Sequence, residues 1–250
     1  MIKYEFPLNE RIRKFLRIEE IFQKMDSQMA IKSDFSDYSC FDTFFEIMAT
    51  ASRADLKVEL IQEIEKQRSK MKIKSKTKKN IAIIKDLDIT RKQLEKSKVI
   101  AGSNFGGDKF LTELKTRAAS PFGIVSTDFP EFQYWLQKTT ISERKSYFNS
   151  QIKDFIPIKN AISNLMKLLR GNIHTKSMST KSGSLQYKLD PLLKNDLVAI
   201  TVGESSRFYP NISSNKYAVN VHFASKGELS PTSSKSVKFK CKSNKRFTKK

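Results

Sequence analysis

The sequence predicts an α+β protein: a helical domain followed by an antiparallel β-strand domain, with one strand contributed from mid-chain. Apolar residues recur at helical spacing in most segments up to Arg170. Beyond Asn172 the segments are short, alternating or rich in β-branched residues, and clusters of Gly, Pro, Asn and Ser separate them. Runs of helices followed by runs of strands indicate α+β rather than α/β architecture.

The first helix is expected to follow Asn9, a residue type that favours helix N-caps. A second apolar stretch spans 35–51, and a third helix is expected to begin near Ser52. Gly171 is well placed to end the last helix. Further helical patterns cover 81–98, 110–120, a short helix from Pro130 to Leu136, 142–155 and 157–170.

The mid-chain strand is expected at 122–129, a short β-branched segment bounded by Pro121 and Pro130. Residues 174–184 lack apolar periodicity and are interpreted as a loop. Strands are expected within 184–190, 196–202, 216–223 and 236–242. The expected domains are therefore a helical one (1–117 and 138–173), a β one (118–137 and 181–242) and a basic tail (243–250).

The net charge is strongly positive, and the excess is concentrated in two segments of the chain. The 250 residues carry a formal net charge of +21. Residues 66–79 and 235–250 each hold eight basic residues and no acid, so the rest of the chain carries only +5. Such strips attract polyanions or acidic partners. Equally, they can be a solvated face and a disordered tail that raise solubility, and the sequence leaves both interpretations open.

The chemistry of an enzyme is not evident. The sequence lacks phosphate-binding glycine loops, zinc-binding His and Cys motifs and a nucleophile elbow. Its histidines, His174 and His222, have no obvious catalytic partner nearby, and its cysteines, Cys40 and Cys241, cannot form a four-ligand zinc site. We therefore expect no catalysis. No apolar run suits a signal peptide or a membrane span, so we expect a soluble, cytoplasmic protein.

The function class that remains is recognition of an acidic partner by basic residues. Arg13 and Arg17 lie one helical turn apart, as do Arg53 and Lys57. Such pairs can hold carboxylates or phosphates through charge-assisted hydrogen bonds. The alternative is intramolecular pairing. In that case Glu20 would pair with Arg17 or Lys24, and Asp55 and Glu59 would pair with Arg53 and Lys57.

Several segments, in order, resemble the ZapD family of FtsZ-associated bacterial cell division proteins. Tyr4–Phe22 (YEFPLNERIRKFLRIEEIF) carries the most specific match, to the Pro-Leu-Asn-Glu and Leu-Arg-Ile-Glu elements that open the family. Ser52–Gln67, the Phe129-Pro to Trp135-Leu segment and Arg207–Ser213 are also similar to family segments. The resemblance covers Tyr4 to Cys241, nearly the whole chain.

The resemblance implies a homodimer formed mainly through the helices, recruited to the mid-cell division ring. It implies binding to the C-terminal tail of FtsZ and bundling of FtsZ filaments, without catalysis or cofactor. By position, the basic residues of the family's tail-binding surface are Arg13, Arg17, Arg53 and Lys109 here. A family histidine corresponds to Gln133, and a strand basic residue corresponds to Ala218, with Lys216 as the nearest substitute. The candidate FtsZ-binding residues are thus Arg13, Arg17, Arg53, Lys57, Lys109 and Lys216.

The competing interpretation is a non-enzymatic nucleic-acid-binding protein that uses the two basic strips. The strips are mostly lysine without interleaved aromatic residues, and no nucleic-acid-binding motif is present. We therefore expect nucleic acid to bind only as a non-specific side effect.

Overall fold

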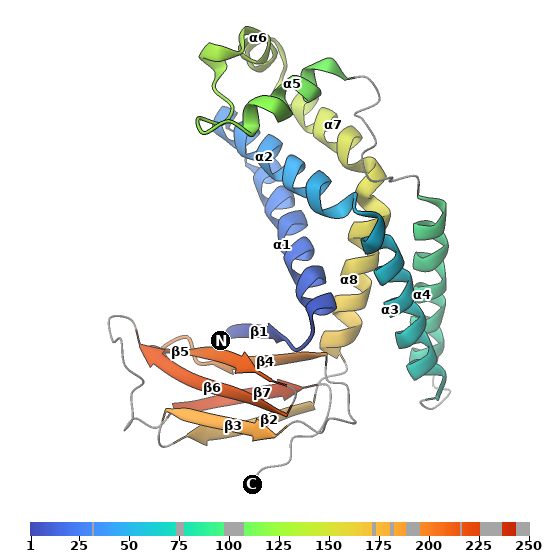
Figure 1. The fold of residues 1–250 in the computed structure, drawn as a ribbon, viewed down its shortest axis with the longest axis vertical. Helices are drawn as coiled ribbons and strands as arrows, with labels where there is room; N and C mark the ends of the chain where they lie inside the picture. Colours follow the sequence, from blue (N-terminus) through green and yellow to red (C-terminus); the bar gives the residue numbers. More distant parts are fainter. Residues whose placement is uncertain are drawn as a thin grey trace. The chain divides into compact units, whose positions relative to one another are not determined.

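The chain folds into two compact units, shown as a ribbon in Figure 1. The computed structural model describes residues 1–31, 33–73, 78–97, 108–171, 174–180, 183–188, 196–215, 217–225 and 237–243. The β unit comprises Met1–Leu16 and Met166–Lys250, and the helical unit comprises Arg17–Leu165. The division falls within two helices, α1 (Glu10–Ala30) and α8 (Ile156–Gly171). The α+β prediction is confirmed.

The β unit contains two antiparallel sheets. One has the strand order β1-β4-β7-β2 and the other β3-β6-β5. Every strand pair described in either sheet is antiparallel. The strands are β1 (Ile2–Pro7), β2 (His174–Thr180), β3 (Ser184–Lys188), β4 (Leu197–Val202), β5 (Phe208–Ser214), β6 (Ala218–Ser225) and β7 (Val237–Ser243).

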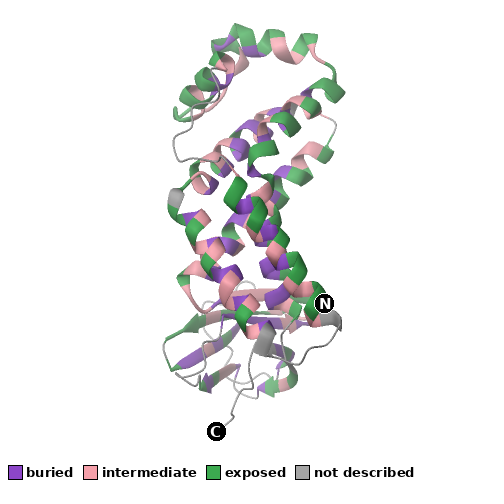
Figure 2. Cartoon of the chain, turned by 90° about the vertical axis from the view of Figure 1, so that its right-hand side faces the viewer, coloured by how far each residue is buried: buried purple, intermediate pink, exposed green. Residues whose placement is uncertain are grey.

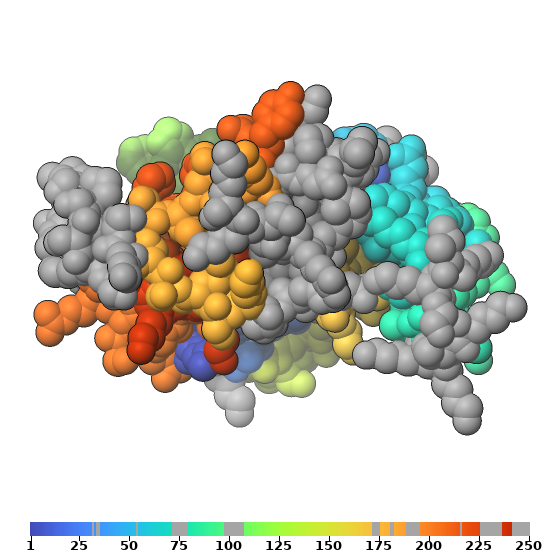
Figure 3. Space-filling view, turned by 90° about the horizontal axis from the view of Figure 1, so that it is seen from below, coloured from blue at the N-terminus to red at the C-terminus, as the bar shows by residue number. Residues whose placement is uncertain are grey.

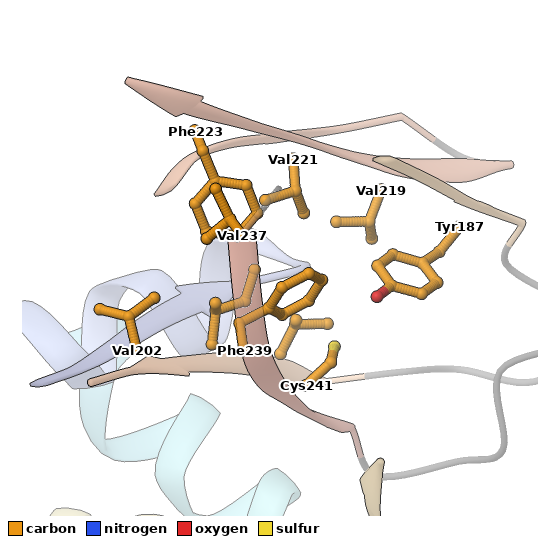
Figure 4. Packing of buried hydrophobic residues seen from close by; sticks show 10 residues of the cluster. Tyr187, Val202, Val219, Val221, Phe223, Val237, Phe239 and Cys241 are labelled. Atoms are coloured by element: carbon orange, nitrogen blue, oxygen red, sulfur yellow. The ribbon is translucent and has the colours of Figure 1, made fainter. Parts of the chain in front are cut away.

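Apolar side chains from both sheets form one core. Figure 4 shows Val221 and Phe223 of β6 above Val237 and Phe239 of β7, and the Phe223 and Phe239 ring centroids are 4.9 Å apart. Tyr187 of β3 is 1% exposed, and its hydroxyl donates to Met178 Sδ of β2 at 2.6 Å. The strand alternation of β7, which the sequence predicts, therefore buries one of its faces.

Two strands arise where none was expected. The interpretation of 174–184 as a loop is wrong, because residues 174–180 form β2, at the edge of the four-stranded sheet as described. An edge strand with one core-facing side needs few apolar residues, and here Met178 packs against the core while Thr180 is buried. Residues 2–7 form β1, although they were assigned to the helical domain. Tyr4 packs against the sandwich core and pairs with Ile200, which explains this strand.

The mid-chain strand expected at 122–129 is absent, and this prediction is wrong. Gly123 takes a φ of +68°, and Ser126–Asp128 form a short 3-10 helix, η1. Phe122 is 85% exposed, and the described residues place no strand beside the segment. A β-branched segment without a neighbouring strand leaves its ladder hydrogen bonds unmade. The structure places residues 118–137 in the helical unit.

The helical unit is built on amphipathic helices with aromatic packing. Figure 2 shows buried positions recurring along the sides of its helices. Phe41 lies at the centre of its aromatic cluster, with ring centroids 4.7 Å from Phe148 and 5.5 Å from Trp135. The elements, besides parts of α1 and α8, are α2 (Asp34–Ala51), α3 (Ala54–Ile73), α4 (Lys78–Lys96), α5 (Lys109–Ala118), η1, α6 (Pro130–Lys138), α7 (Ile141–Ile152) and η2 (Lys153–Phe155).

Several predicted helix boundaries are confirmed. Asn9 Oδ1 accepts from the backbone N–H of Ile12 at 2.9 Å, as an N-cap does. Pro130 is the first residue of α6, and α8 ends at Gly171. Ser52, in contrast, follows α2, where its hydroxyl donates to the Met48 carbonyl oxygen. α3 begins two residues later at Ala54.

The two basic strips are only partly described. The first spans the end of α3 and the start of α4, and its residues 74–77 lie outside the described residues. The second includes β7, which extends to Ser243, so the expected basic tail begins no earlier than residue 244. Residues 244–250 lie outside the described part of the chain.

Candidate functional site

Five of the six predicted binding residues lie among the described residues. Arg13 and Arg17 are on α1, Arg53 immediately precedes α3, Lys57 is on its first turn, and Lys109 opens α5. Lys216 lies outside the described residues. Whether each basic group could receive a partner depends on what it already contacts.

Arg13 is engaged within the β unit. Its Nε lies 3.0 Å from Glu10 Oε1, one turn earlier on α1. Its guanidinium carbon lies 5.6 Å from the centroid of the Phe6 ring, which is a cation–π contact. The side chain is 33% exposed, so one edge of the guanidinium remains accessible to a ligand. Arg13 can contribute to binding, but part of its donor capacity is already used.

Arg17 is exposed on α1 and is not paired with Glu20. Among the described residues, neither side chain has a hydrogen bond or an ion pair. Lys24, the alternative partner of Glu20, instead lies 3.2 Å from Glu46 Oε2 on α2. The intramolecular alternative predicted for Arg17 is therefore not observed, and its guanidinium donors have no partner among the described residues.

Arg53 and Lys57 have different environments. Arg53 is exposed, and its side chain has no polar partner in the described part of the chain. Lys57 Nζ donates to two backbone carbonyl oxygens, that of Glu95 at 3.2 Å and that of Ser97 at 2.9 Å. These carbonyls are at the C-terminus of α4, where a cation is favourable. Lys57 thus joins α3 to α4, and the two residues are not a matched binding pair.

Lys109 is exposed at the first position of α5. Asp108, the N-cap, accepts from the Leu111 backbone N–H at 3.0 Å. Its other carboxylate oxygen accepts from the Tyr147 hydroxyl at 3.0 Å. Asp108 is thereby occupied by neutral donors, and Lys109 has no ion-pair partner among the described residues. The Lys109 ammonium group is accessible to an external acid.

Of the six predicted binding residues, three therefore remain exposed and available in the helical unit: Arg17, Arg53 and Lys109. They come from three different elements, α1, the α2–α3 junction and α5. No contact among them is found in the described chain. The arrangement provides separate anchor points for carboxylates rather than one enclosed pocket.

Arg117 was not singled out by the sequence. It lines a cavity of about 450 Å³ together with Glu113 and Asp128, between α5 and the segment that follows it. Its guanidinium carbon lies 4.7 Å from the centroid of the Phe129 ring. Arg117 belongs to no motif or basic pair in the sequence, so only the fold reveals it. Because the cavity also holds two acids, it suits an acidic ligand less well than the three exposed cations.

The other positions carried over from the family differ in exposure. Gln133 is exposed on α6, so an uncharged amide stands there. Ala218 is 6% exposed in β6 and presents no polar group.

Among the described residues, no group of three or more His, Cys, Asp or Glu could hold a metal ion. None of the described helices combines the length and hydropathy that a bilayer span requires.

A family model and individual relatives agree on what this chain is similar to. The model of ZapD, described as a cell division protein, matches residues 16–222. The "Cell division protein ZapD" of Azoarcus sp. (strain BH72) is 31% identical over 231 residues, covering 89% of this chain and 90% of the relative. The proteins of the same name from Dechloromonas aromatica (strain RCB) and Nitrosomonas eutropha are 29% and 30% identical, with the same coverage.

Proposed function

The chain belongs to the ZapD family of cell division proteins, and from this premise we propose that it binds the C-terminal tail of FtsZ. In this role it bundles FtsZ filaments and stabilises the division ring at mid-cell. It acts as a homodimer and without catalysis. The observation that carries the proposal is the exposed Arg17 guanidinium, which lies in the most specific family motif and is left unpaired by Glu20.

The available cations can recognise carboxylates. A guanidinium binds a carboxylate through two parallel hydrogen bonds, whereas an ammonium acts as a point charge. Arg17 and Arg53 therefore supply directional contacts, and Lys109 adds electrostatic attraction. Arg13 lies on α1, as Arg17 does. Its guanidinium is partly paired with Glu10 and supplies a further contact to the ligand. Lys57 supports the site by holding α3 and α4 together.

Bundling needs two binding surfaces that face different filaments. A two-fold homodimer supplies two equivalent surfaces. Individually weak contacts to a polymer then gain from multivalency, because the second contact is effectively intramolecular. The contacts are exposed and ionic, so bundling weakens as salt rises and the Debye length shortens.

The test is co-sedimentation with FtsZ filaments that carry or lack the C-terminal tail. We expect this protein to pellet with the first and to remain in the supernatant with the second. A parallel DNA mobility shift at the same salt tests the competing nucleic-acid function. Tail-independent pelleting, or tighter binding to DNA than to filaments at matched salt, would contradict the proposal.

A further inference from the structure

The outer face of the four-stranded sheet carries a lysine-lined groove that the proposed function does not use. Its volume is about 610 Å³, and it lies within the β unit. In Figure 3 the later strands of this unit appear in orange to red at the surface, and the N-terminal residues appear in blue. The groove's polar lining residues include Lys176, Lys238, Lys240, Ser177, Ser179 and Thr201.

Strand alternation places the lysines here. In β7, Val237, Phe239 and Cys241 are buried in the sandwich core, so Lys238 and Lys240 fall on the opposite, outer face. Both lysines are exposed. Alternate residues of a strand are about 6.8 Å apart, which sets the spacing of the two positions.

The sheet register places hydroxyl-bearing residues beside both lysines. Lys240 lies opposite Ser177 of β2 on one side and opposite Thr201 of β4 on the other. Lys238 lies opposite Ser179. Serine and threonine hydroxyls can donate to carboxylate oxygens, while the lysines neutralise the charge.

Little negative charge offsets these lysines. The described residues of β2, β4 and β7 include no Asp or Glu. Glu5 of β1 is held by Arg170 and Lys3, and Glu204, beyond the end of β4, pairs with the amino group of Met1.

The other sheet of the same sandwich has a different outer face. Gln186, Asn220 and Ser213 lie side by side across β3, β6 and β5. In the next such row, Ser184, His222 and Asn211 face one another. The described part of that face is polar and carries one lysine, Lys188 of β3. The outer face of the four-stranded sheet carries more, because Lys3, Lys238 and Lys240 share it.

We propose that this groove binds an extended, acidic polypeptide segment with carboxylates at alternate positions. Such a segment repeats its side chains at the same spacing as the lysines of β7, so carboxylates and ammonium groups match in register. The aliphatic stems of Lys238 and Lys240 offer apolar contact to the residues between the carboxylates. Tight binding of single-stranded nucleic acid also uses exposed aromatic side chains for base stacking, and the one ring in the lining, Phe239, is 4% exposed.

Fluorescence anisotropy with a labelled peptide that alternates glutamate and valine tests the proposal. We expect the wild-type protein to bind it at low salt, and Lys238→Glu/Lys240→Glu to weaken binding by about tenfold. Lys238→Arg/Lys240→Arg keeps the charge and should retain binding. If the charge reversal lowers the melting temperature, Lys238→Gln/Lys240→Gln is used in its place. This variant should also weaken peptide binding.

The matched control is Lys167→Glu/Lys188→Glu, which changes the net charge equally at exposed positions of the same unit. It should leave peptide binding nearly unchanged. Equal losses in the control and groove variants would show general charge attraction and overturn the proposal. It is also overturned if wild type does not bind the peptide, or if a single-stranded oligonucleotide binds the groove more tightly. The proposed function is tested through Arg17 in the helical unit, so either can fail independently.

Discussion

Arg170 of α8 forms a bidentate ion pair with Glu5 of β1. The Nε–Oε1 distance is 2.9 Å and the Nη2–Oε2 distance is 2.8 Å. Lys3 also donates to the same carboxylate. The pair joins two segments of the β unit that are far apart in the sequence, so the last turn of α8 is tied to the first strand.

This pair predicts a loss of stability in acid. Burial raises the pKa of Glu5, but hydrogen bonds from Arg170 and Lys3 outweigh it and lower the pKa below the ordinary value of 4.5. A lowered folded-state pKa contributes stability that is complete above pH 4.5 and is lost as pH falls through the folded pKa. Urea unfolding from neutral pH to about pH 3 should show this loss in wild type and a smaller one in Glu5→Gln. Identical pH profiles would contradict the linkage.

Loss of the ion pair between Arg144 and Asp37 should destabilise the helical unit. Arg144 Nε lies 2.9 Å from Asp37 Oδ2, and the side chains are only 5% and 10% exposed. Arg144 also donates to the carbonyl oxygens of Leu136 and Thr139, at the end of α6. Arg144→Met leaves a buried carboxylate uncompensated and should cost about 3 kcal/mol in the free energy of unfolding. Lys145→Met, at the adjacent half-buried position, should cost less than about 1 kcal/mol.

Arg17→Glu should abolish bundling and leave the fold intact. Arg17 has no polar partner among the described residues, so its reversal breaks no observed contact while it repels an acidic ligand. Light scattering of FtsZ filaments and thermal melting measure the two effects. Lys153→Glu, an exposed reversal on η2 of the same unit, is the control and should bundle normally. Normal bundling by Arg17→Glu would remove this residue from the site.

Arg53 and Lys57 should separate binding from stability. Lys57→Met removes the donor to two carbonyl oxygens at the end of α4 and should cost about 1 kcal/mol of stability, with tail binding retained. Arg53→Glu should weaken tail binding without a change in melting temperature. Denaturant unfolding and peptide anisotropy on both variants distinguish the roles. A loss of binding in Lys57→Met at unchanged stability would place its ammonium group in the binding surface.

Cys40 should be inert in the folded protein. Burial, and secondarily the negative charge of Asp37, raise the pKa of its thiol to about 12. The reactive thiolate therefore forms only in strong base, and the buried sulfur is shielded as well. Cys241 is also buried. Ellman's reagent at pH about 8 should label neither cysteine in the native state and both after unfolding in urea. Rapid labelling of native protein would contradict the packing around α2.

The basic residues show how much of the candidate site could be predicted from the sequence. Family position selected Arg13, Arg17, Arg53 and Lys109. The structure leaves the last three exposed and without a polar partner among the described residues, whereas Arg13 is paired with Glu10. Helical spacing selected Lys57 equally well, yet its ammonium is used by the end of α4. Spacing along one helix cannot reveal a carbonyl that another helix presents. Arg117 was missed for the same reason, since Phe129 reaches it only through the fold.

By itself, the sequence determined the family, the succession of helices, four of the strands after α8, and the local roles of Asn9 and Pro130. Asn9 and Pro130 act through residues within one turn, so their roles can be predicted from neighbours alone. Tertiary structure decided the rest. Residues 174–180 became a strand because β7 pairs with them, and residues 122–129 did not because no described strand lies beside them. Backbone hydrogen bonds in a helix are local, whereas those of a sheet need a partner that only the folded chain supplies.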